Sequence, residues 1–399
     1  MPGNLLKQRW GLELSRRFRR WAGTGMGVPS GFVARLIGPQ EGTRWRDVRK
    51  GPGSGFFCRW RGMERMMVEG QVSITPAKPG CAQDGNPGVF PLGIPQGSVP
   101  AYVHWMPSVI YHGLHGAITG RDGMVYTELL DCPLEELDLS QARERGLTFT
   151  GKVMALSCSK NYFHWLLKML PRLDLVERAE GSLEGIEVFL INKPTWQQEE
   201  VYKRLDIWDR CVVMDRKSYA ACRMLVAPSL AHDGPGWACQ YVRRKLGVEE
   251  GVGEAGRMTY VRRGKTAHRV LVNEEEVCAL LRGYGFEVVH CSGLSVEEQA
   301  RVFARSGVIV GVHGAAFSNL VFCNPGTVVL EIFGTPMNQK LYWLMSHRMG
   351  LRYHYLMAAG AGDDKAGNMA DITVDLEMLG QSVEGILRKG AGGMAGSGN

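Results

Sequence analysis

Residues 308–319 read VIVGVHGAAFSN, an apolar run that ends in a histidine and three small residues. The run predicts a buried strand of a parallel sheet, and the residues after it predict a short loop that opens directly into a helix. In open α/β sheets, ligands gather at the carboxyl ends of strands, where the first N–H groups of helices face anions. Gly314 and Ala315 leave room for a phosphate to approach the backbone. His313 is expected at the rim as a donor, and Asn319 is expected to bond either the loop or the ligand. A tight turn that only lets the helix pack on the sheet would have the same sequence.

The chain on either side of this stretch alternates strand-like and helical patterns. Two blocks, at about residues 150–250 and 256–360, have the spacing of parallel βαβ units. The second block contains two pairs with the spacing of a capping box, Asn273 with Glu276 and Ser295 with Glu298. We therefore predict an α/β protein with two Rossmann-like, parallel-sheet domains.

A second cluster, of basic residues, follows the strand expected at residues 258–261. Residues 260–269 read YVRRGKTAHR, and Arg263 and Arg269 have the geometry to clamp a diphosphate through bidentate hydrogen bonds. Taken alone, the loop also has the composition of solvated basic surface. Because this loop and the one at His313 both follow strands of one expected sheet, we expect them to face the same crevice.

A third stretch, residues 161–172, reads NYFHWLLKMLPR and predicts a helix with Asn161 at its N-cap. Pro171 should interrupt this helix. His164 follows an expected strand, and histidine is the side chain best suited to remove a proton near neutral pH. A histidine among so many apolar side chains also has the setting of a core residue. Asp233, in a turn-rich stretch, is the reserve candidate for the same role.

The first part of the chain differs in charge from the rest. Residues 1–65 carry 14 Lys and Arg against 4 Asp and Glu, whereas the whole 399-residue chain carries 47 against 40. Frequent Gly and Pro predict that residues 1–100 are irregular. A basic arm with Trp10, Phe18 and Trp21 among its arginines suits an anionic membrane surface or nucleic acid, and equally a solvated, flexible segment. The nearly neutral remainder argues against nucleic-acid binding as the main function.

Several classes of protein are disfavoured by what the sequence lacks. No apolar run approaches the roughly 20 residues of a membrane span, and no signal-peptide pattern opens the chain, so we expect a cytoplasmic protein. The ten cysteines include no Cys-x-x-Cys pair, which favours free thiols over zinc or disulfides. No Asp-x-Asp pair occurs, which disfavours a bound metal of the kind common in nucleotide-sugar enzymes. No G-x-G-x-x-G opens an expected helix, which disfavours a dinucleotide-dependent oxidoreductase, and no P-loop pattern occurs, which excludes a P-loop enzyme.

Three blocks of the sequence, in order, resemble glycosyltransferase family 61. The blocks are NYFHWLLKMLPRL at residues 161–173, the run from Arg263 through Arg269 to Asn273 and Glu274, and VGVHGAAFSNLVF at residues 310–322 followed by NPGT and Glu331. Ala316 and Ser318 stand where this family usually has glycine and threonine, and both are small. The resemblance covers about residues 100–360, and we expect a bacterial member of the capsular-polysaccharide type.

The resemblance implies a GT-B arrangement, in which two Rossmann-like domains face a central cleft. The acceptor-side domain is expected over residues 101–250, entered through a β-hairpin, and the nucleotide-sugar domain over residues 256–385, before a disordered tail at 386–399. The implied reaction is an inverting transfer, without metal or other cofactor, from a nucleoside-diphosphate sugar that we expect to be UDP-linked. The implied acceptor is a glycan or lipid-linked glycan in surface or capsular polysaccharide synthesis.

Roles for individual residues follow from that chemistry. Without a metal, arginines and helix N–H groups must stabilise the leaving diphosphate. Glu331 is expected either to accept hydrogen bonds from ribose hydroxyls or to form an ion pair. The expected donor site comprises Arg263, Arg269, His313, Gly314, Ala315, Asn319 and Glu331; the candidate bases are His164 and, in reserve, Asp233; the acceptor side comprises Asn161 and Tyr162.

Two alternatives stay open at this point. One is a non-catalytic nucleotide- or carbohydrate-binding module on the same fold, which would bind nucleotide without releasing sugar. The other is nucleic-acid binding through residues 1–65, which would depend strongly on salt. The transferase is the leading hypothesis, in the cytoplasm and peripherally attached to the inner face of the membrane through the basic arm, with no nucleic-acid partner.

Overall fold

The computed structural model divides the chain into two compact units. The first comprises residues 1–71 and 99–232, and the second comprises residues 72–98 and 233–399. The structure describes residues 36–37, 46–50, 56–60, 63–69, 80–81, 101–113, 115–120, 125–126, 129–130, 139, 145–156, 161–229, 231, 234–247, 257–264, 269–334, 340–360 and 370–392.

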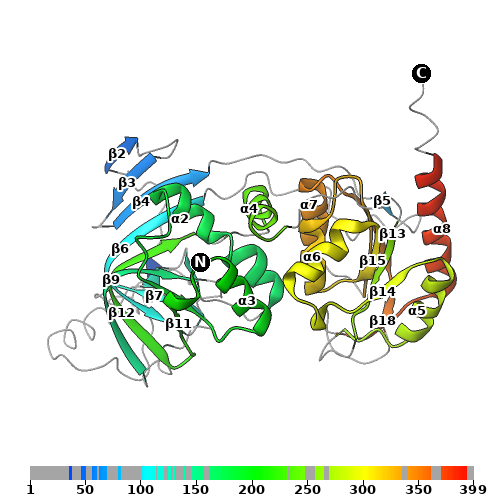
Figure 1. The fold of residues 1–399 in the computed structure, drawn as a ribbon, viewed down its shortest axis with the longest axis horizontal. Coiled ribbons are helices and arrows are strands. Elements are labelled where there is room, and N and C mark those ends of the chain that lie inside the picture. Colours follow the sequence, from blue (N-terminus) through cyan, green and yellow to red (C-terminus); the bar gives the residue numbers. More distant parts are fainter. Residues whose placement is uncertain are drawn as a thin grey trace, which may run out of the picture. The chain divides into compact units, whose positions relative to one another are not determined.

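The first unit is built on a mixed sheet (Figure 1). Four neighbouring strands run parallel in the order β12-β9-β10-β11. Helices connect β9 to β10 and β10 to β11, so this part consists of the predicted βαβ units. The bounds are β9 Arg145–Ala155, α2 Arg172–Glu180, β10 Val188–Ile191, α3 Trp196–Arg204, η5 Trp208–Arg210, β11 Cys211–Val213 and β12 Ser218–Pro228.

Antiparallel pairing in the first unit corrects the prediction of a parallel sheet there. Strand β6, Ala101–His112, pairs antiparallel with β12, β4 and β7. A periodic apolar pattern identifies a strand but does not specify the direction of its partner, so the sequence could not decide this. The remaining strands are β1 Leu36–Ile37, β2 Arg46–Lys50, β3 Phe56–Trp60, β4 Met63–Glu69, β7 Ile118–Thr119 and β8 Val125–Tyr126.

Strands also lie in the first hundred residues, where we predicted irregular chain. β2, β3 and β4 pair antiparallel in succession, and β4 joins them to β6. In the sequence, GPGSG separates β2 from β3, and Arg61-Gly62 separates β3 from β4. Antiparallel neighbours need only short connections, in which glycine is common. The glycines at these positions therefore lie in the sequence between closely spaced antiparallel strands.

The helix predicted at residue 161 forms, and Pro171 interrupts it. The side-chain oxygen of Asn161 accepts a hydrogen bond from the Phe163 backbone N–H at 2.9 Å, which is the predicted N-cap. The chain continues as a π-helix, η4, over His164–Met169. Pro171 then takes the N-cap position of α2. A π-helix is rare and frequently marks a functional site, and here it begins at the candidate base.

The second unit contains a parallel sheet of six strands within its described residues, in the order β14-β13-β15-β16-β17-β5. Helices alternate with the strands along the chain from β13 to β17, as predicted. The strands are β5 Gly80–Cys81, β13 Arg257–Val261, β14 Glu287–Val289, β15 Ser306–Val312, β16 Val328–Phe333 and β17 Arg352–Met357, with a small antiparallel pair of β18 Ala359–Gly360 and β19 Ile372–Thr373. The helices are α4 Gly236–Leu246, α5 Glu274–Gly283, η6 Cys291–Gly293, α6 Val296–Arg305, η7 Ala315–Phe322, α7 Leu341–Arg348 and α8 Leu376–Gly392.

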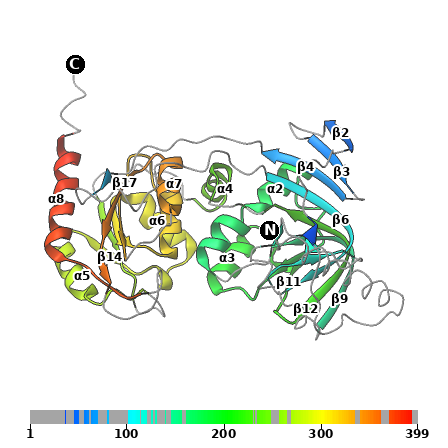
Figure 2. The ribbon, with the colours of Figure 1, turned by 180° about the vertical axis from the view of Figure 1, so that it is seen from behind.

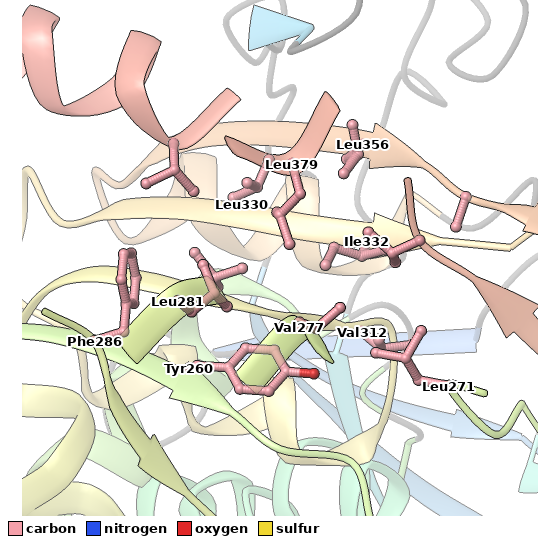
Figure 3. Packing of buried hydrophobic residues seen from close by; sticks show 14 of the residues in the cluster. Tyr260, Leu271, Val277, Leu281, Phe286, Val312, Leu330, Ile332, Leu356 and Leu379 are labelled. Atoms are coloured by element: carbon pink, nitrogen blue, oxygen red, sulfur yellow. The ribbon is translucent and has the colours of Figure 1, made fainter. Parts of the chain in front are cut away.

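Helices cover both faces of this sheet. Figures 1 and 2 show α5 and α8 on one face and α6 and α7 on the other. Figure 3 shows the core under α5 and α8, where Tyr260, Leu330 and Leu356 of three strands meet Leu281 and Leu379 of the two helices. Residues of a strand alternate between faces, so the residues next to these point to the α6 and α7 side.

The C-terminal helix α8 extends into the segment predicted to be disordered. It runs to Gly392, whereas we predicted disorder from residue 386. Leu379, Val383 and Ile386 recur at helical spacing and all belong to the core of this unit, in which Figure 3 labels Leu379. The glycines around them masked this apolar face in the sequence.

One of the two predicted capping boxes forms. Ser295 and Glu298 exchange the expected bonds at the start of α6, at 3.1 and 2.7 Å. Asn273 takes the N-cap position of α5, but its side chain bonds the backbone N–H and C=O of Val374 at 3.0 and 2.8 Å instead of forming a box with Glu276. A distant segment thus supplied two hydrogen bonds that sequence spacing cannot anticipate.

Among the described residues, no helix is long and apolar enough to cross a membrane. Cys211, Cys222, Cys239, Cys278, Cys291 and Cys323 are free thiols.

A buried histidine makes the stability of the first unit depend on pH. His112 accepts or donates one hydrogen bond, between Nε2 and Thr119 Oγ1 at 2.9 Å, and burial lowers its pKa from 6.5 to about 4. The unfolded chain binds a proton at this residue below pH 6.5, and the folded chain binds it only near pH 4. Stability is therefore lost as pH falls through this window, by up to about 3 kcal/mol.

We predict that His112→Gln reduces the loss of thermal stability between about pH 7.5 and about pH 5 by roughly 4 °C relative to wild type. Melting curves of both proteins at each pH measure this difference, and other titrating groups cancel in the comparison. An equal pH dependence in the two proteins would contradict the assignment.

Candidate active site

The strand order of the second unit creates a switch point between β13 and β15. From β13 the chain passes through α5 to β14 on one side, and from β14 it returns through α6 to β15 on the other side. Since the two connections diverge over opposite faces, the carboxyl ends of β13 and β15 are where such folds bind ligands. Arg263 lies two residues after β13, and His313 directly follows β15.

Arg263 is in direct contact with the loop after β15, which we expected to face the same crevice. The Nη1 atom of Arg263 donates to the carbonyl oxygen of His313 at 2.9 Å. A Cβ atom on Gly314 would lie 2.3 Å from the same Nη1. The backbone at Gly314 is extended, with φ at 179°, so glycine is needed here for space and not for its backbone conformation.

Glu274 holds the loop that carries Arg263. Its carboxylate, in the first turn of α5, accepts the backbone N–H groups of Arg263 and Gly264 at 2.7 and 3.0 Å. The Tyr260 hydroxyl and the Arg262 guanidinium also donate to it, at 3.3 and 3.4 Å. We did not predict this role, although Glu274 belongs to the second block of family resemblance. The sequence did offer a signal for this role: Glu274 directly follows Asn273, the expected N-cap, and so lies at the start of the helix.

Arg269 lies close to Arg263 in a strained conformation. Its φ is +57°, the left-handed region that side chains other than glycine rarely adopt. Its Nε is buried with no hydrogen-bond partner in the described part of the chain. Burial, together with the charge of Arg269, lowers the pKa of Arg263 to about 10, and burial also lowers the pKa of Arg269. Arg263 therefore stays charged at neutral pH, and this arginine pair (Arg263 and Arg269) concentrates positive charge at the switch point.

His313 and Glu331 form a buried pair on the α6 and α7 side of the sheet. His313 Nδ1 bonds Glu331 Oε1, and the Tyr353 hydroxyl donates to Glu331 Oε2 at 2.6 Å. The imidazole stacks on Phe333, with ring centroids 5.3 Å apart, and meets Tyr342 at 5.2 Å. Glu331 is 1% exposed and has a partner on each oxygen, so of its two expected roles a pairing within the fold fits better than a contact with a ribose hydroxyl.

Ala315 and Asn319 lie on η7, the helix that follows. Ala315 is its first residue, so the backbone N–H groups of this turn start at the switch point. Asn319 is fully buried and its amide donates to Gln299 of α6 at 2.7 Å. Its bond thus ties η7 to α6 inside the fold, and no contact with a ligand is needed to explain it.

The predicted residues of the first unit cluster at the start of η4, beyond the carboxyl end of β9. Asn161 is exposed and caps this helix, while Tyr162 packs on Trp165 with ring centroids 5.7 Å apart. His164 is half-buried, with its Nδ1 inside the protein and its ring at right angles to that of Phe163, 5.6 Å away. The histidine is therefore neither a fully enclosed core residue nor a free surface side chain.

The structure thus gathers most of the expected donor residues and places the others separately. The second unit brings together Arg263, Arg269, His313, Gly314, Ala315 and Glu331, whereas Asn161, Tyr162 and His164 belong to the first unit. Asp233 lies outside the described residues. Within the described residues, no three His, Cys, Asp or Glu side chains are grouped to hold a metal ion.

Comparison with known proteins agrees with the resemblance noted in the sequence. Residues 162–330 match the family Glycosyltransferase 61, and with the relatives below this match supports a glycosyltransferase. The beta-1,2-xylosyltransferase RCN11 of Oryza sativa subsp. japonica is 31% identical over 106 residues, which is 25% of this chain and 20% of that protein. The beta-1,2-xylosyltransferase of Arabidopsis thaliana is 25% identical over 136 residues, which is 31% of this chain and 26% of that protein. The chain spans between a fifth and about a quarter of the length of these curated relatives. Both are plant proteins, so the bacterial, capsule-type part of the prediction gains no support from them.

Gly314→Ala tests whether the arginine pair binds anions in the arrangement described. The new methyl group must displace the Arg263 guanidinium, the mobile end of a flexible side chain, so the fold should lose less than about 1 kcal/mol. We expect the Kd of inorganic pyrophosphate, measured by calorimetry, to rise about tenfold, because a charge-assisted bond is misplaced. Gly293→Ala is the control, since a Cβ there meets nothing within 4 Å. Equal pyrophosphate affinity in the two variants would argue against this anion site.

Proposed function

We propose that this protein transfers a sugar from a nucleoside-diphosphate sugar to a hydroxyl group of a glycan or lipid-linked glycan. The observation that carries the proposal is the arginine pair, two charged and partly buried guanidinium groups at the switch point between β13 and β15. A diphosphate is the ligand whose charge and size suit two adjacent guanidinium groups. The match of residues 162–330 to the family Glycosyltransferase 61 supports the view that this diphosphate is part of a sugar donor.

The proposed reaction is a single displacement that inverts the anomeric carbon. The acceptor oxygen loses its proton to a base and attacks the anomeric carbon, while the bond from that carbon to the diphosphate oxygen breaks. The electron pair leaves with the nucleoside diphosphate, whose new charge the arginine pair stabilises. The first backbone N–H groups of η7 start at the same switch point, where they would add to this stabilisation. His164 is the proposed base, and Asn161 and Tyr162 are the proposed acceptor-side residues.

A GT-B arrangement, with the donor on the second unit and the acceptor on the first, extends this proposal. Two compact units, each with parallel strands joined through helices, support it. The lack of an Asp-x-Asp pair in the sequence supports transfer without a metal. UDP-xylose is the first donor to test, because both curated relatives are named xylosyltransferases. A role in surface or capsular polysaccharide synthesis, at the cytoplasmic face of a membrane, is the context we propose.

Thermal unfolding with nucleotides tests the donor class. At about 100 times its dissociation constant, a ligand adds roughly 2.7 kcal/mol to stability, so UDP should raise the melting temperature by several degrees. The increase should be the same with EDTA and absent in Arg263→Ala. Arg257→Ala is the matched control, because Arg257 begins the same strand and its guanidinium pairs with Glu287 at 3.3 Å, away from the switch point. An increase with NAD but not with any nucleoside diphosphate would refute the proposal.

Donor hydrolysis tests catalysis without knowledge of the acceptor. Wild-type protein should slowly release UDP from UDP-xylose or another UDP-sugar, with water in place of the acceptor. His164→Ala should keep the UDP-dependent increase in melting temperature and lose about 100-fold or more in the rate of UDP release, as expected on removal of a general base. Unchanged release in His164→Ala would exclude this histidine as the base. Binding of UDP without release from any UDP-sugar would identify a non-catalytic binding module.

A further inference from the structure

A line of hydrogen-bonded groups crosses the sheet of the second unit and ends at the arginine pair. Four neighbouring strands, β17, β16, β15 and β13, each contribute one member, either within the strand or within two residues of its end. The Tyr353 hydroxyl donates to Glu331 Oε2 at 2.6 Å, Glu331 Oε1 bonds His313 Nδ1, and Arg263 Nη1 donates to the His313 carbonyl oxygen at 2.9 Å. The members of this relay therefore connect in the order of the strands.

The relay lies on the face of the sheet opposite the apolar core of Figure 3. Leu330 and Ile332 belong to that core, so Glu331 between them points to the other face. Tyr353, Glu331 and His313 are all buried, with exposed fractions of 6%, 1% and 5%. Enclosing a carboxylate in this way seldom stabilises a fold more than apolar side chains of similar volume would. A function other than stability is thus needed to explain these groups.

We infer that Tyr353 and Glu331 are positioning residues that fix the guanidinium of Arg263 for the leaving diphosphate. This inference rests on the proposed function. Tyr353 orients the Glu331 carboxylate, which accepts the Nδ1–H of His313 and so fixes the imidazole. The His313 backbone N–H also donates to the Ile332 carbonyl oxygen at 2.9 Å, so the residue is held from both its side chain and its backbone. Its carbonyl oxygen is then a fixed acceptor for Arg263.

The same contacts argue against a direct contact between Glu331 and the donor. One carboxylate oxygen is occupied by Tyr353 and the other by His313. A ribose hydroxyl would have to enter a site that is 99% enclosed and displace one of these partners. Glu331 therefore acts through His313, and Tyr353 acts through Glu331.

Tyr353→Phe removes one hydroxyl and leaves the ring that fills the core. We expect the Kd of UDP, measured by calorimetry, to rise about fivefold, because the guanidinium is no longer held in one position. Tyr284→Phe is the matched control, since the Tyr284 hydroxyl also donates to a glutamate, Glu384 of α8, at 2.9 Å, and both residues lie outside the relay. It should change the affinity for UDP less than about 1.5-fold.

A double-mutant cycle separates positioning from a general loss of stability. In an Arg263→Lys background, where the guanidinium is absent, Tyr353→Phe should change the Kd of UDP less than about 1.5-fold. An equal factor in both backgrounds would overturn the relay, as would equal effects of Tyr353→Phe and Tyr284→Phe. Should Tyr353→Phe fail to fold, Glu331→Gln takes its place in the cycle with the same expected outcomes.

A spectroscopic measurement without ligand distinguishes failure of the relay from failure of the proposed function. The Nε–H signal of Arg263, identified by its loss in Arg263→Lys, should shift in the NMR spectrum of Tyr353→Phe and stay in place in Tyr284→Phe. An unchanged signal in both variants would overturn the relay whatever the protein binds. If the signal shifts but the protein binds neither UDP nor pyrophosphate, the relay to Arg263 is supported and its proposed role in binding the diphosphate is refuted.

Discussion

In the second unit the chain leaves β13 toward β14 and comes back to β15 on the other side, and this reversal determines where the protein can hold an anion. Right-handed crossovers place α5 and α6 on opposite faces of the sheet, as Figure 1 shows. The loops that follow β13 and β15 then meet at one edge. The bond between Arg263 and the His313 carbonyl, the need for glycine at residue 314 and the closeness of Arg269 all depend on that meeting.

The two faces of the same sheet differ in composition. One face stabilises the fold, and the other carries polar groups next to the proposed site. The face under α5 and α8 is apolar, from Tyr260 through Leu330 to Leu356, and burial of such side chains is the main favourable contribution to folding. The face under α6 and α7 contains Glu331 and His313, buried groups that cost free energy unless every one is hydrogen-bonded. The apolar face offsets that cost, so the polar groups can be arranged for binding.

The sequence predicted the parts of the fold that depend on local pattern. Apolar runs separated by helical segments located β13 to β17, and the Ser295–Glu298 spacing located the start of α6. The positions of Arg263 and His313 after strands of one sheet predicted that their loops face the same crevice, and the two residues are in contact. The parts that depend on distant partners were missed. Pattern alone could not show that β6 pairs antiparallel with β12, that Asn273 bonds Val374, or that Glu274 holds the loop of Arg263. Asn319 was predicted to bond the loop or a ligand because it follows the His313 loop. Its partner is instead Gln299 of α6, which its position in the sequence could not indicate.

The pairing of β5 with β17 has a consequence for how the chain folds during synthesis. Gly80–Cys81 leaves the ribosome some 270 residues before Arg352–Met357, which at roughly 5 to 20 residues per second is a delay of about 15 to 50 seconds. The parallel strands of the first unit are complete once β12 has emerged, so that unit can fold while the second is still being translated. The core of the second unit needs α8 as well, the last helix among the described residues. The segment of β5 is therefore synthesised well before its partner β17. During that interval its backbone N–H and C=O groups can pair with a wrong strand, the kind of exposure from which chaperones protect nascent proteins.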